Sequence, residues 1–278
     1  MNFTDFAAVY GLIITHLETG RWIRVPTEDH PRKQNGSYLF RGDHGFVRNY
    51  ATMTDPVLWK GDRRLAPSRS EMAASRAEAL KRREQEQAAA AKKAAGILKG
   101  AVKATHPYLA RKGFPDTRGA VWRDLLVVPM RIDQRLVGCQ LIDEAGGKKF
   151  LRGQATTGAY YIIDNHGPDI LCEGLATGLS VRRAMQHLRQ RYRIIVCFSA
   201  GNLGAASRAD TLIVADNDPA GLAAAQGAAR VWVGAPGEDF NDREQAHGTA
   251  AAAASLAEAF GLPPSVRDTP GVRPDTMR

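Results

Sequence analysis

The carboxylates of Glu173, Asp216 and Asp218 stand where predicted strands end. Glu173 directly follows the apolar run ILC, and Asp216 and Asp218 directly follow TLIVA. In an open parallel sheet, ligand chemistry collects beyond the carboxyl ends of the strands. Carboxylates gathered at one edge would raise each other's pKa unless a divalent cation lay between them, and hard oxygen ligands of this kind select Mg²⁺. The pattern therefore predicts a magnesium site, which Mn²⁺ could also occupy.

Each of these acids also has a structural interpretation. Asp218 is followed by Pro219, as expected for an N-cap residue with proline at the first helical position. An acid-x-acid pattern alone arises easily by chance in a chain of this composition. The combination favours a functional site, because Glu-Gly follows one strand, Asp-x-Asp follows another, and helices and strands alternate between them.

Strands and helices alternate from residue 170 onward. The strand ILC precedes an amphipathic helix that extends to about residue 190, followed by the strand RIIVCF, a short helix and the strand TLIVA. A helix beginning at Pro219 and the strand RVWVG come next. This alternation predicts an α/β fold with a parallel sheet covered by helices, whose strand ends open on one edge.

Two smaller groups of strands are predicted upstream. Residues 124–163 contain four strand-like runs, LLVVPMRI, RLVGCQLID, KKFLRG and AYYIID, which we assign to one small sheet. Residues 4–17 have helical spacing, and 21–60 alternate turn signals with short aromatic runs that predict antiparallel strands. The aromatic residues of this region could stack nucleic-acid bases, but we interpret them as a small core; they are Trp22, Tyr38, Phe40 and Phe46.

Positive charge is concentrated in one segment. The chain has a formal net charge of +9, and residues 60–103 contain 12 lysines and arginines against 5 acids. A basic stripe of this kind suits a polyanion, because neutralised phosphates release counterions. The alternative is a solvated helix whose charges have no partner. Alanine runs and few apolar anchors predict an exposed, linker-like helix over roughly 64–100.

Several protein classes are excluded by what the sequence lacks. No apolar run approaches the length of a membrane span, and the first residues lack the pattern of a signal peptide. Cys139, Cys172 and Cys197 lie far apart in separate apolar runs, so neither a cysteine zinc cluster nor a disulfide framework is expected. These features predict a soluble intracellular protein without a membrane partner.

The segments ILCEGLATGLSVRRA and TLIVADNDPAGLAAA resemble the two motifs of the Toprim domain, found in bacterial-type primases, topoisomerases and some nucleases. Glu173, Asp216 and Asp218 match the acidic positions of that family. The resemblance implies a parallel sheet between helices and acids that bind Mg²⁺ for phosphoryl transfer. The run GEDFND resembles the late acidic motif of Toprim primases and implies Asp239 as a further metal ligand. The alternative is a capping box formed by Asn241 and Glu244.

The resemblance extends upstream to elements of the primase catalytic core. The segments YLARKG, VPMRID with LVGCQ, KKFLRG and GAYY resemble them in order and spacing, so that the similarity covers roughly residues 105–242. It implies that Lys148, Lys149 and Arg152 contact triphosphate or template phosphates. Two departures stand out: an arginine expected near Gln140 is missing, and residues 21–50 lack the cysteines with which such front modules hold zinc. No zinc is therefore expected.

The resemblance implies a DNA primase, a nucleotidyltransferase that makes short RNA primers on single-stranded DNA from nucleoside triphosphates. The chain has no P-loop motif, so a separate replicative helicase is the expected partner, and a phage or plasmid origin fits this arrangement. The location that the resemblance implies is the cytoplasm of a bacterial or phage-infected bacterial cell. Two alternatives remain open. One is a Toprim-type nicking nuclease that uses the same carboxylates, and the other is a non-catalytic nucleic-acid-binding accessory protein of replication.

These observations together predict five regions. They are a small N-terminal module without zinc (1–60), a basic helical linker (61–104), a mixed α+β primase subdomain (105–168), a Toprim-type domain (169–260) and a disordered tail (261–278). The tail has four prolines in its 18 residues, a composition typical of disorder.

Overall fold

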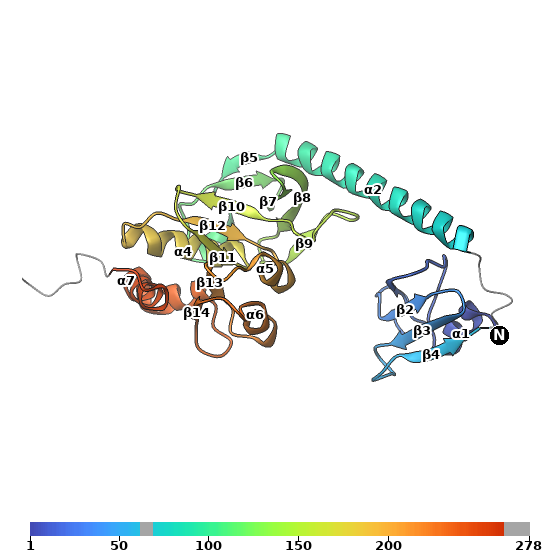
Figure 1. Cartoon of the computed structure of the whole chain (residues 1–278). Helices are drawn as coiled ribbons and strands as arrows, with labels where there is room; N and C mark the ends of the chain where they lie inside the picture. Colours follow the sequence, from blue (N-terminus) through green and yellow to red (C-terminus); the bar gives the residue numbers. More distant parts are fainter. Residues whose placement is uncertain (62–68, 264–278) are drawn as a thin grey trace, which may run out of the picture. The chain divides into compact units, whose positions relative to one another are not determined.

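The computed structural model describes residues 1–61 and 69–263 and has a mixed α/β fold (Figure 1). The chain divides into two compact units, Met1–Glu86 and the residues from Gln87 onward. Most of the predicted tail, from residue 264, lies outside the described residues, as do Arg63 and Arg64 of the basic segment. In the described part of the chain, no helix has both the length and the apolar character needed to cross a membrane.

The first unit is a helix packed on an antiparallel sheet. Its four strands lie in the order β1-β2-β3-β4, namely β1 (Trp22–Val25), β2 (Gly36–Phe40), β3 (His44–Asn49) and β4 (Val57–Lys60). Helix α1 (Phe3–Val9) places Phe3 against Tyr38 and Phe40 in the core. The prediction of antiparallel strands in this region is confirmed.

Helix α1 is shorter than the sequence pattern predicts. Its N-cap is Asn2, whose side chain accepts a hydrogen bond from the Asp5 N–H at 2.8 Å. The helix ends at Val9 because Gly11 follows with φ of 74°, a left-handed conformation that glycine adopts without strain. The prediction of a helix over 4–17 is therefore wrong beyond Val9; Leu12 instead forms a bridge with Thr27.

Helix α2 (Arg69–Lys99) is one continuous helix that carries most of the described basic residues of this segment (Figure 1). In the first unit, the guanidinium groups of Arg21 and Arg82 both pair with Glu18. In the second unit, Ala94 and Ile97 are buried, at 0% and 5% exposure, in a cluster with strands of the adjacent sheet. The expected exposed helix is thus confirmed as a helix, but its last turns belong to a core.

The second unit begins with a five-stranded antiparallel sheet. The order is β5-β6-β7-β8-β9, with β5 (Val102–Ala104), β6 (Gly119–Trp122), β7 (Leu125–Ile132), β8 (Arg135–Ile142) and β9 (Lys148–Phe150). Helix α3 (Pro107–Arg111) lies between β5 and β6 in the chain. Three of the four strands predicted for 124–163 pair as expected. The fourth, β10 (Tyr161–Asp164), leaves this sheet and pairs antiparallel with β12 (Arg193–Val196).

The other sheet of this unit has the order β10-β12-β11-β13-β14. Strands β11 (Asp169–Cys172), β12, β13 (Leu212–Ala215) and β14 (Arg230–Val233) are parallel to one another, as the sequence predicts. The helices that connect or follow them are α4 (Leu175–His187), α5 (Ala200–Ala206), α6 (Pro219–Ala224) and α7 (Phe240–Phe260).

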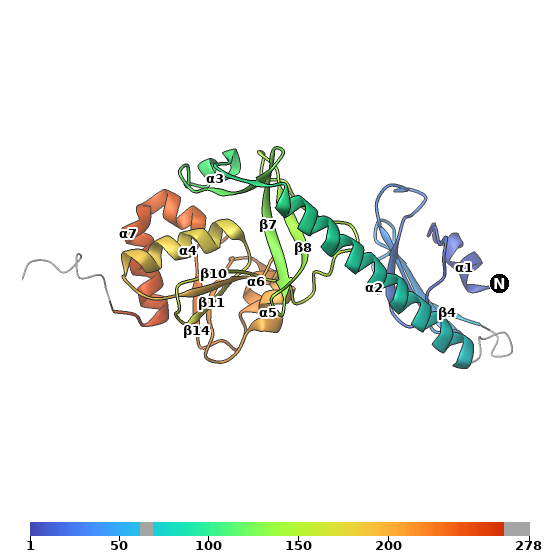
Figure 2. The same ribbon diagram turned by 90° about the horizontal axis from the view of Figure 1, so that it is seen from above.

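The helices cover both faces of this parallel sheet. Successive residues of β11 face opposite helical layers. Ile170 and Cys172 lie in the core beneath α4 and α7. Leu171 packs on the other face with Leu203 of α5 and Ala225, which follows α6. Figure 2 shows α4 and α7 running beside each other on one side of the sheet. Both faces of the strands are therefore buried, and only the strand ends remain open for polar chemistry.

A buried polar network joins α4, α7 and the turn after α3. The Arg183 guanidinium pairs with the Glu244 carboxylate at 3.2 Å and donates to the Gly113 carbonyl oxygen at 2.9 Å. The amide nitrogen of Asn241, a residue with no exposed surface, donates to the Lys112 carbonyl oxygen and to the Ser180 hydroxyl. These contacts attach the start of the antiparallel sheet to the helical layer of the parallel one.

Candidate active site

The predicted carboxylates lie at one edge of the parallel sheet. Glu173 follows β11, and Asp216 and Asp218 follow β13, the strand that pairs directly with β11 in parallel register. Because Cys172 lies opposite Val214, the two strands end together and their following residues leave the sheet side by side. The expectation that these acids share an edge is confirmed.

The strand order of the sheet reverses at this edge, between β11 and β13. From β11 the chain goes first to β12 on one side and then to β13 on the other. The connections after β11 and β13 consequently lead to opposite faces of the sheet, to α4 on one face and to α6 on the other. Glu173 and Asp216 flank this topological switch point, where ligands of open α/β sheets bind.

Asp216 is the most strongly perturbed of the acids. Burial raises its pKa, and the nearby carboxylates of Asp239, Glu173 and Asp218 raise it further, to about 6, against a smaller opposing effect of Lys148. Its Oδ1 atom is buried and has no hydrogen-bond partner among the described residues. Buried polar atoms are normally paired, so this oxygen is a candidate to bind a cation.

Glu173 is half-buried beside the same group of charges. Burial raises its pKa, the Asp218 carboxylate adds to this, and the Lys148 ammonium lowers it. The backbone around Glu173 is fixed, because its carbonyl oxygen accepts a hydrogen bond from the Phe198 N–H at 2.9 Å. Phe198 itself has φ of 65°, an uncommon conformation for a bulky residue. The end of β12 is therefore held tightly against the end of β11.

Asp218 has a structural role as well as a place at the site. Its Oδ1 atom accepts a hydrogen bond from the Gly221 N–H at 2.7 Å and caps α6, with Pro219 at the first helical position. The capping interpretation of the sequence is thus confirmed, yet the residue is exposed and its charge acts on both Glu173 and Asp216. One oxygen caps the helix, and the other is free of any hydrogen bond to described residues.

Asp239 caps helix α7. Its side chain accepts from the Asp242 N–H at 2.8 Å, and the Asp242 side chain reaches back to the Asp239 N–H. This capping box begins two residues before the one suggested by the sequence, so the interpretation of Asn241 as the cap is wrong. The Asp239 charge nevertheless has the largest electrostatic effect on Asp216 of the neighbouring acids.

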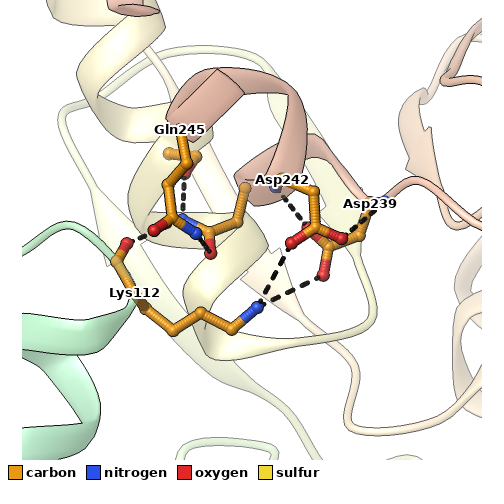
Figure 3. Close-up of polar contacts among 6 residues, drawn as sticks. Lys112, Asp239, Asp242 and Gln245 are labelled. Atoms are coloured by element: carbon orange, nitrogen blue, oxygen red, sulfur yellow. Dashed lines mark hydrogen bonds and ion pairs between the residues drawn. The ribbon is translucent and has the colours of Figure 1, made fainter. Parts of the chain in front are cut away.

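A lysine from the distant α3 region partly neutralises this end of the site. Figure 3 shows the Lys112 ammonium directed at Asp239 and Asp242, at distances of 3.9 Å and 3.5 Å from their carboxylate oxygens. Gln245 donates to Asn241, whose amide donates in turn to the Lys112 backbone. Sequence reasoning did not identify this ion pair, because nothing in the local pattern connects residues so far apart in the chain.

The three predicted phosphate-binding residues are not equivalent. The ammonium of Lys148 lies near Gly174, the residue after Glu173, and lowers the pKa of both Glu173 and Asp216. Side chains alternate along a strand, so Lys149 leaves β9 on the opposite face. Arg152 is exposed beyond the end of β9. The structure therefore brings one of the three, Lys148, to the carboxylates.

Asn217, between the two aspartates, has a role that sequence reasoning missed. Its side-chain amide nitrogen donates to the Gly234 carbonyl oxygen at 2.8 Å. Its backbone carbonyl oxygen accepts a hydrogen bond from the Gly237 N–H at 3.2 Å. These bonds attach the loop after β14 to the loop after β13. They position Asp239 near Asp216, although the two belong to different strand-to-helix connections.

The residues fit a divalent cation in donor type and charge. Within residues 1–61 and 69–263, no three acidic, histidine or cysteine side chains converge closely enough to hold a metal ion as they stand. The buried, unpartnered Oδ1 of Asp216 and the mutual repulsion of the carboxylates are nevertheless what a cation would relieve. Oxygen donors alone, without sulfur or imidazole, suit Mg²⁺ or Mn²⁺.

Gly221→Ala is expected to disturb the site through backbone contact. A Cβ atom at this position would overlap the carbonyl oxygen of Asp216, so α6 would have to move away from the Asp216 loop. Overpacking of this kind costs about 1–3 kcal/mol of unfolding free energy. The matched control is Gly201→Ala in α5, where the added methyl has open space. Urea denaturation of the two variants checks the expectation, and equal stability would contradict it.

Comparison of the chain with protein-family models, with characterised proteins and with solved structures finds no significant match. The functional interpretation therefore depends on the residues and geometry described above.

Proposed function

We propose that the protein is a Toprim-type DNA primase that makes short RNA primers on single-stranded DNA with Mg²⁺. One observation carries this proposal most directly. Asp216 buries a carboxylate oxygen that has no partner within the described part of the chain, at the switch point of a parallel sheet and with further carboxylates around it. A glutamate after the first parallel strand and an Asp-x-Asp after the third, with helices on both faces, match the arrangement that the Toprim resemblance implies.

The proposed chemistry is nucleotidyl transfer. Glu173, Asp216 and Asp218 would hold Mg²⁺, with Asp239 as a further candidate ligand, and the ion would neutralise charge on the reacting phosphates. Lys148 would bind a phosphate oxygen of the incoming nucleoside triphosphate. Glu173 would hold the metal or its water and would accept the proton of the attacking 3′-hydroxyl. That oxygen then bonds to the α-phosphorus, and pyrophosphate leaves.

The surroundings of the carboxylates support roles for the chain's own residues. The Phe150 ring meets Phe198 edge-on, with ring centroids 6.4 Å apart, and this contact holds β9 against the end of β12. Lys148 lies on the same face of β9 as Phe150, so the contact orients its ammonium toward Glu173. Lys149 and Arg152 would then serve more distant phosphates of the template or the triphosphate.

Glu173→Gln tests the proposal with a minimal change in shape. We expect loss of templated oligonucleotide synthesis of at least about 10²-fold, because a proton acceptor and a candidate ligand charge are both removed. The assay incubates the protein with single-stranded DNA, labelled NTPs and Mg²⁺ or Mn²⁺, and resolves the products on a sequencing gel. Glu258→Gln, an exposed glutamate near the end of α7, is the matched control.

The products distinguish the proposal from its alternatives. Short templated oligonucleotides that disappear in Glu173→Gln and persist in the control support a primase. Shortened template without new oligonucleotides would replace the proposal with a nicking nuclease that uses the same acids. If neither product forms with either metal or an added replicative helicase, while DNA binding persists, a non-catalytic accessory protein replaces both enzymes.

A further inference from the structure

The sheet of the first unit has two unlike faces. On one face Tyr38, Phe40 and Val47 pack with α1 in a closed core. Directly paired residues of an antiparallel sheet lie on the same face, and successive residues lie on opposite faces. Trp22 and Phe46 are therefore on the face away from α1, and neither belongs to that core. The interpretation of all four aromatic residues as one core is thus wrong for these two.

The open face carries a row of large apolar side chains across all four strands. Trp22 pairs with Leu39, Leu39 pairs with Phe46, and Phe46 pairs with Leu58. Trp22 and Leu58, on the two outer strands, are 48% and 43% exposed, whereas Phe46 is partly buried and Leu39, between Trp22 and Phe46, is 8% exposed. The Trp22 and Phe46 rings are tilted, with centroids 6.3 Å apart. Large apolar side chains left exposed on a regular sheet face, here Trp22 and Leu58, mark an interaction surface.

Basic residues flank the apolar row. Arg24, Ser37 and Arg48 are paired across the next positions of β1, β2 and β3. The two guanidinium groups lie 4.2 Å and 4.6 Å from the centroid of the Tyr50 ring, which is 44% exposed. On the other side of the row, His44 of β3 and Lys60 of β4 lie opposite each other in the strand register.

The charge around this face suits a polyanion. The Arg24 and Arg48 side chains are held over Tyr50, and the Ser37 hydroxyl donates to the Tyr50 hydroxyl at 3.2 Å. Asp43, an acid in the connection between β2 and β3, pairs with His44 at 2.6 Å. Aromatic rings beside fixed positive charges are the two components of surfaces that bind single-stranded nucleic acid.

We propose that this face binds single-stranded nucleic acid. Bases would stack on Trp22 and Phe46, while the phosphates would follow the Arg24 and Arg48 row. Stacking needs exposed ring faces and tolerates any base, whereas the arginines recognise only the backbone. In its assignment of this face to the template strand, the inference rests on the proposed function. No metal is required for the contact.

Trp22→Ala tests the stacking contact in the full-length protein. We expect the affinity for a fluorescein-labelled oligo-dT, measured by anisotropy with EDTA present, to fall about 5- to 100-fold, since one stacked base is lost. Trp22→Phe should retain most of the affinity because a ring remains. The matched control is Val9→Ala on α1, an apolar residue 71% exposed on the helix side of the sheet. Equal affinity of Trp22→Ala and wild type would overturn the proposal.

Arg24→Ala and photo-crosslinking test whether nucleic acid binds this face or the basic helix α2. Arg24→Ala should reduce the slope of log affinity against log salt by about one, because one phosphate contact is removed. An oligonucleotide with 5-iodouracil should crosslink to peptides that contain Trp22 or Phe46. Crosslinks confined to α2, or equal binding of duplex DNA, would overturn the proposal. Glu173→Gln should bind normally, so failure of catalysis and failure of this contact are distinguishable.

Discussion

Asp216→Asn is expected to abolish the proposed primer synthesis and at the same time to stabilise the metal-free protein. The activity should fall by about 10³-fold or more, because the variant loses the charge at the centre of the candidate metal site. Stability should rise because the amide carries no charge for Asp239, Glu173 and Asp218 to repel. An amide also retains nearly the shape of the carboxylate, so the core around it is preserved.

The free energy of unfolding of the metal-free wild type should fall as pH rises, because the pKa of Asp216 is raised in the fold. The pKa of Asp216 is about 6 in the fold, above its ordinary value of 3.8, so the folded state resists ionisation of this group. The resulting destabilisation is absent below about pH 4, grows between pH 4 and 6, and is constant above that range. After allowance for solvent screening it amounts to about 2 kcal/mol. The metal-free wild type should lose this amount across the window, and Asp216→Asn should not.

Urea denaturation with EDTA from pH 4 to 8 measures the difference, and added Mg²⁺ should then raise the stability of the wild type more than that of the variant. Asp210→Asn is the matched control, because Asp210 is exposed before the start of β13 rather than at its end. A variant that is inactive and also less stable than wild type in EDTA would contradict the explanation, since the loss of activity would then reflect damage to the fold.

Among the proposed substitutions, Arg183→Leu is expected to lower the free energy of unfolding the most. The Glu244 side chain is 3% exposed, and its Oε2 atom has no partner among the described residues. Removal of the guanidinium leaves this carboxylate buried without a cation, a change that costs about 3–5 kcal/mol. Since small domains are stable by only about 5–15 kcal/mol, the variant should be partly unfolded at moderate urea concentrations.

The double variant Arg183→Leu/Glu244→Leu isolates the charge contribution. Two apolar side chains in this place leave no buried charge, so the double variant should be more stable than Arg183→Leu alone. Arg183 also stacks on the Phe114 ring at 4.3 Å, and both variants lose that contact equally. Arg182→Leu is the control on the same helix. If the double variant were the less stable of the two, Glu244 would not depend on Arg183 for compensation.

Local patterns were sufficient to predict the elements that carry the candidate site. The apolar runs before Glu173 and Asp216 are strands, and the helices between them make those strands parallel. This follows from sequence because hydrophobic periodicity and connection length are local properties. The capping role of Asp218 was predictable for the same reason, since it depends only on the next residues in the chain.

Contacts between distant segments could not be predicted in this way. The pairing of Lys112 with Asp239 requires that the α3 turn dock on α7 through Asn241. Similarly, strand register decides which aromatic residues of the first unit are buried, and a shift of one residue would exchange Tyr38 with Leu39 between faces. Such features depend on tertiary packing, which no short window of residues contains.

The candidate site combines parts of the fold that open on different timescales. The carboxylates of Glu173 and Asp216 follow β11 and β13, central strands that are paired on both sides. Lys148 lies on β9, a three-residue edge strand with exposed side chains. Backbone hydrogen bonds of buried central strands break only in rare, extensive unfolding events, whereas those of short edge strands open by frequent local fluctuations. The carboxylates are therefore preorganised, while the Lys148 ammonium can move away from them and return without disturbing the central strands.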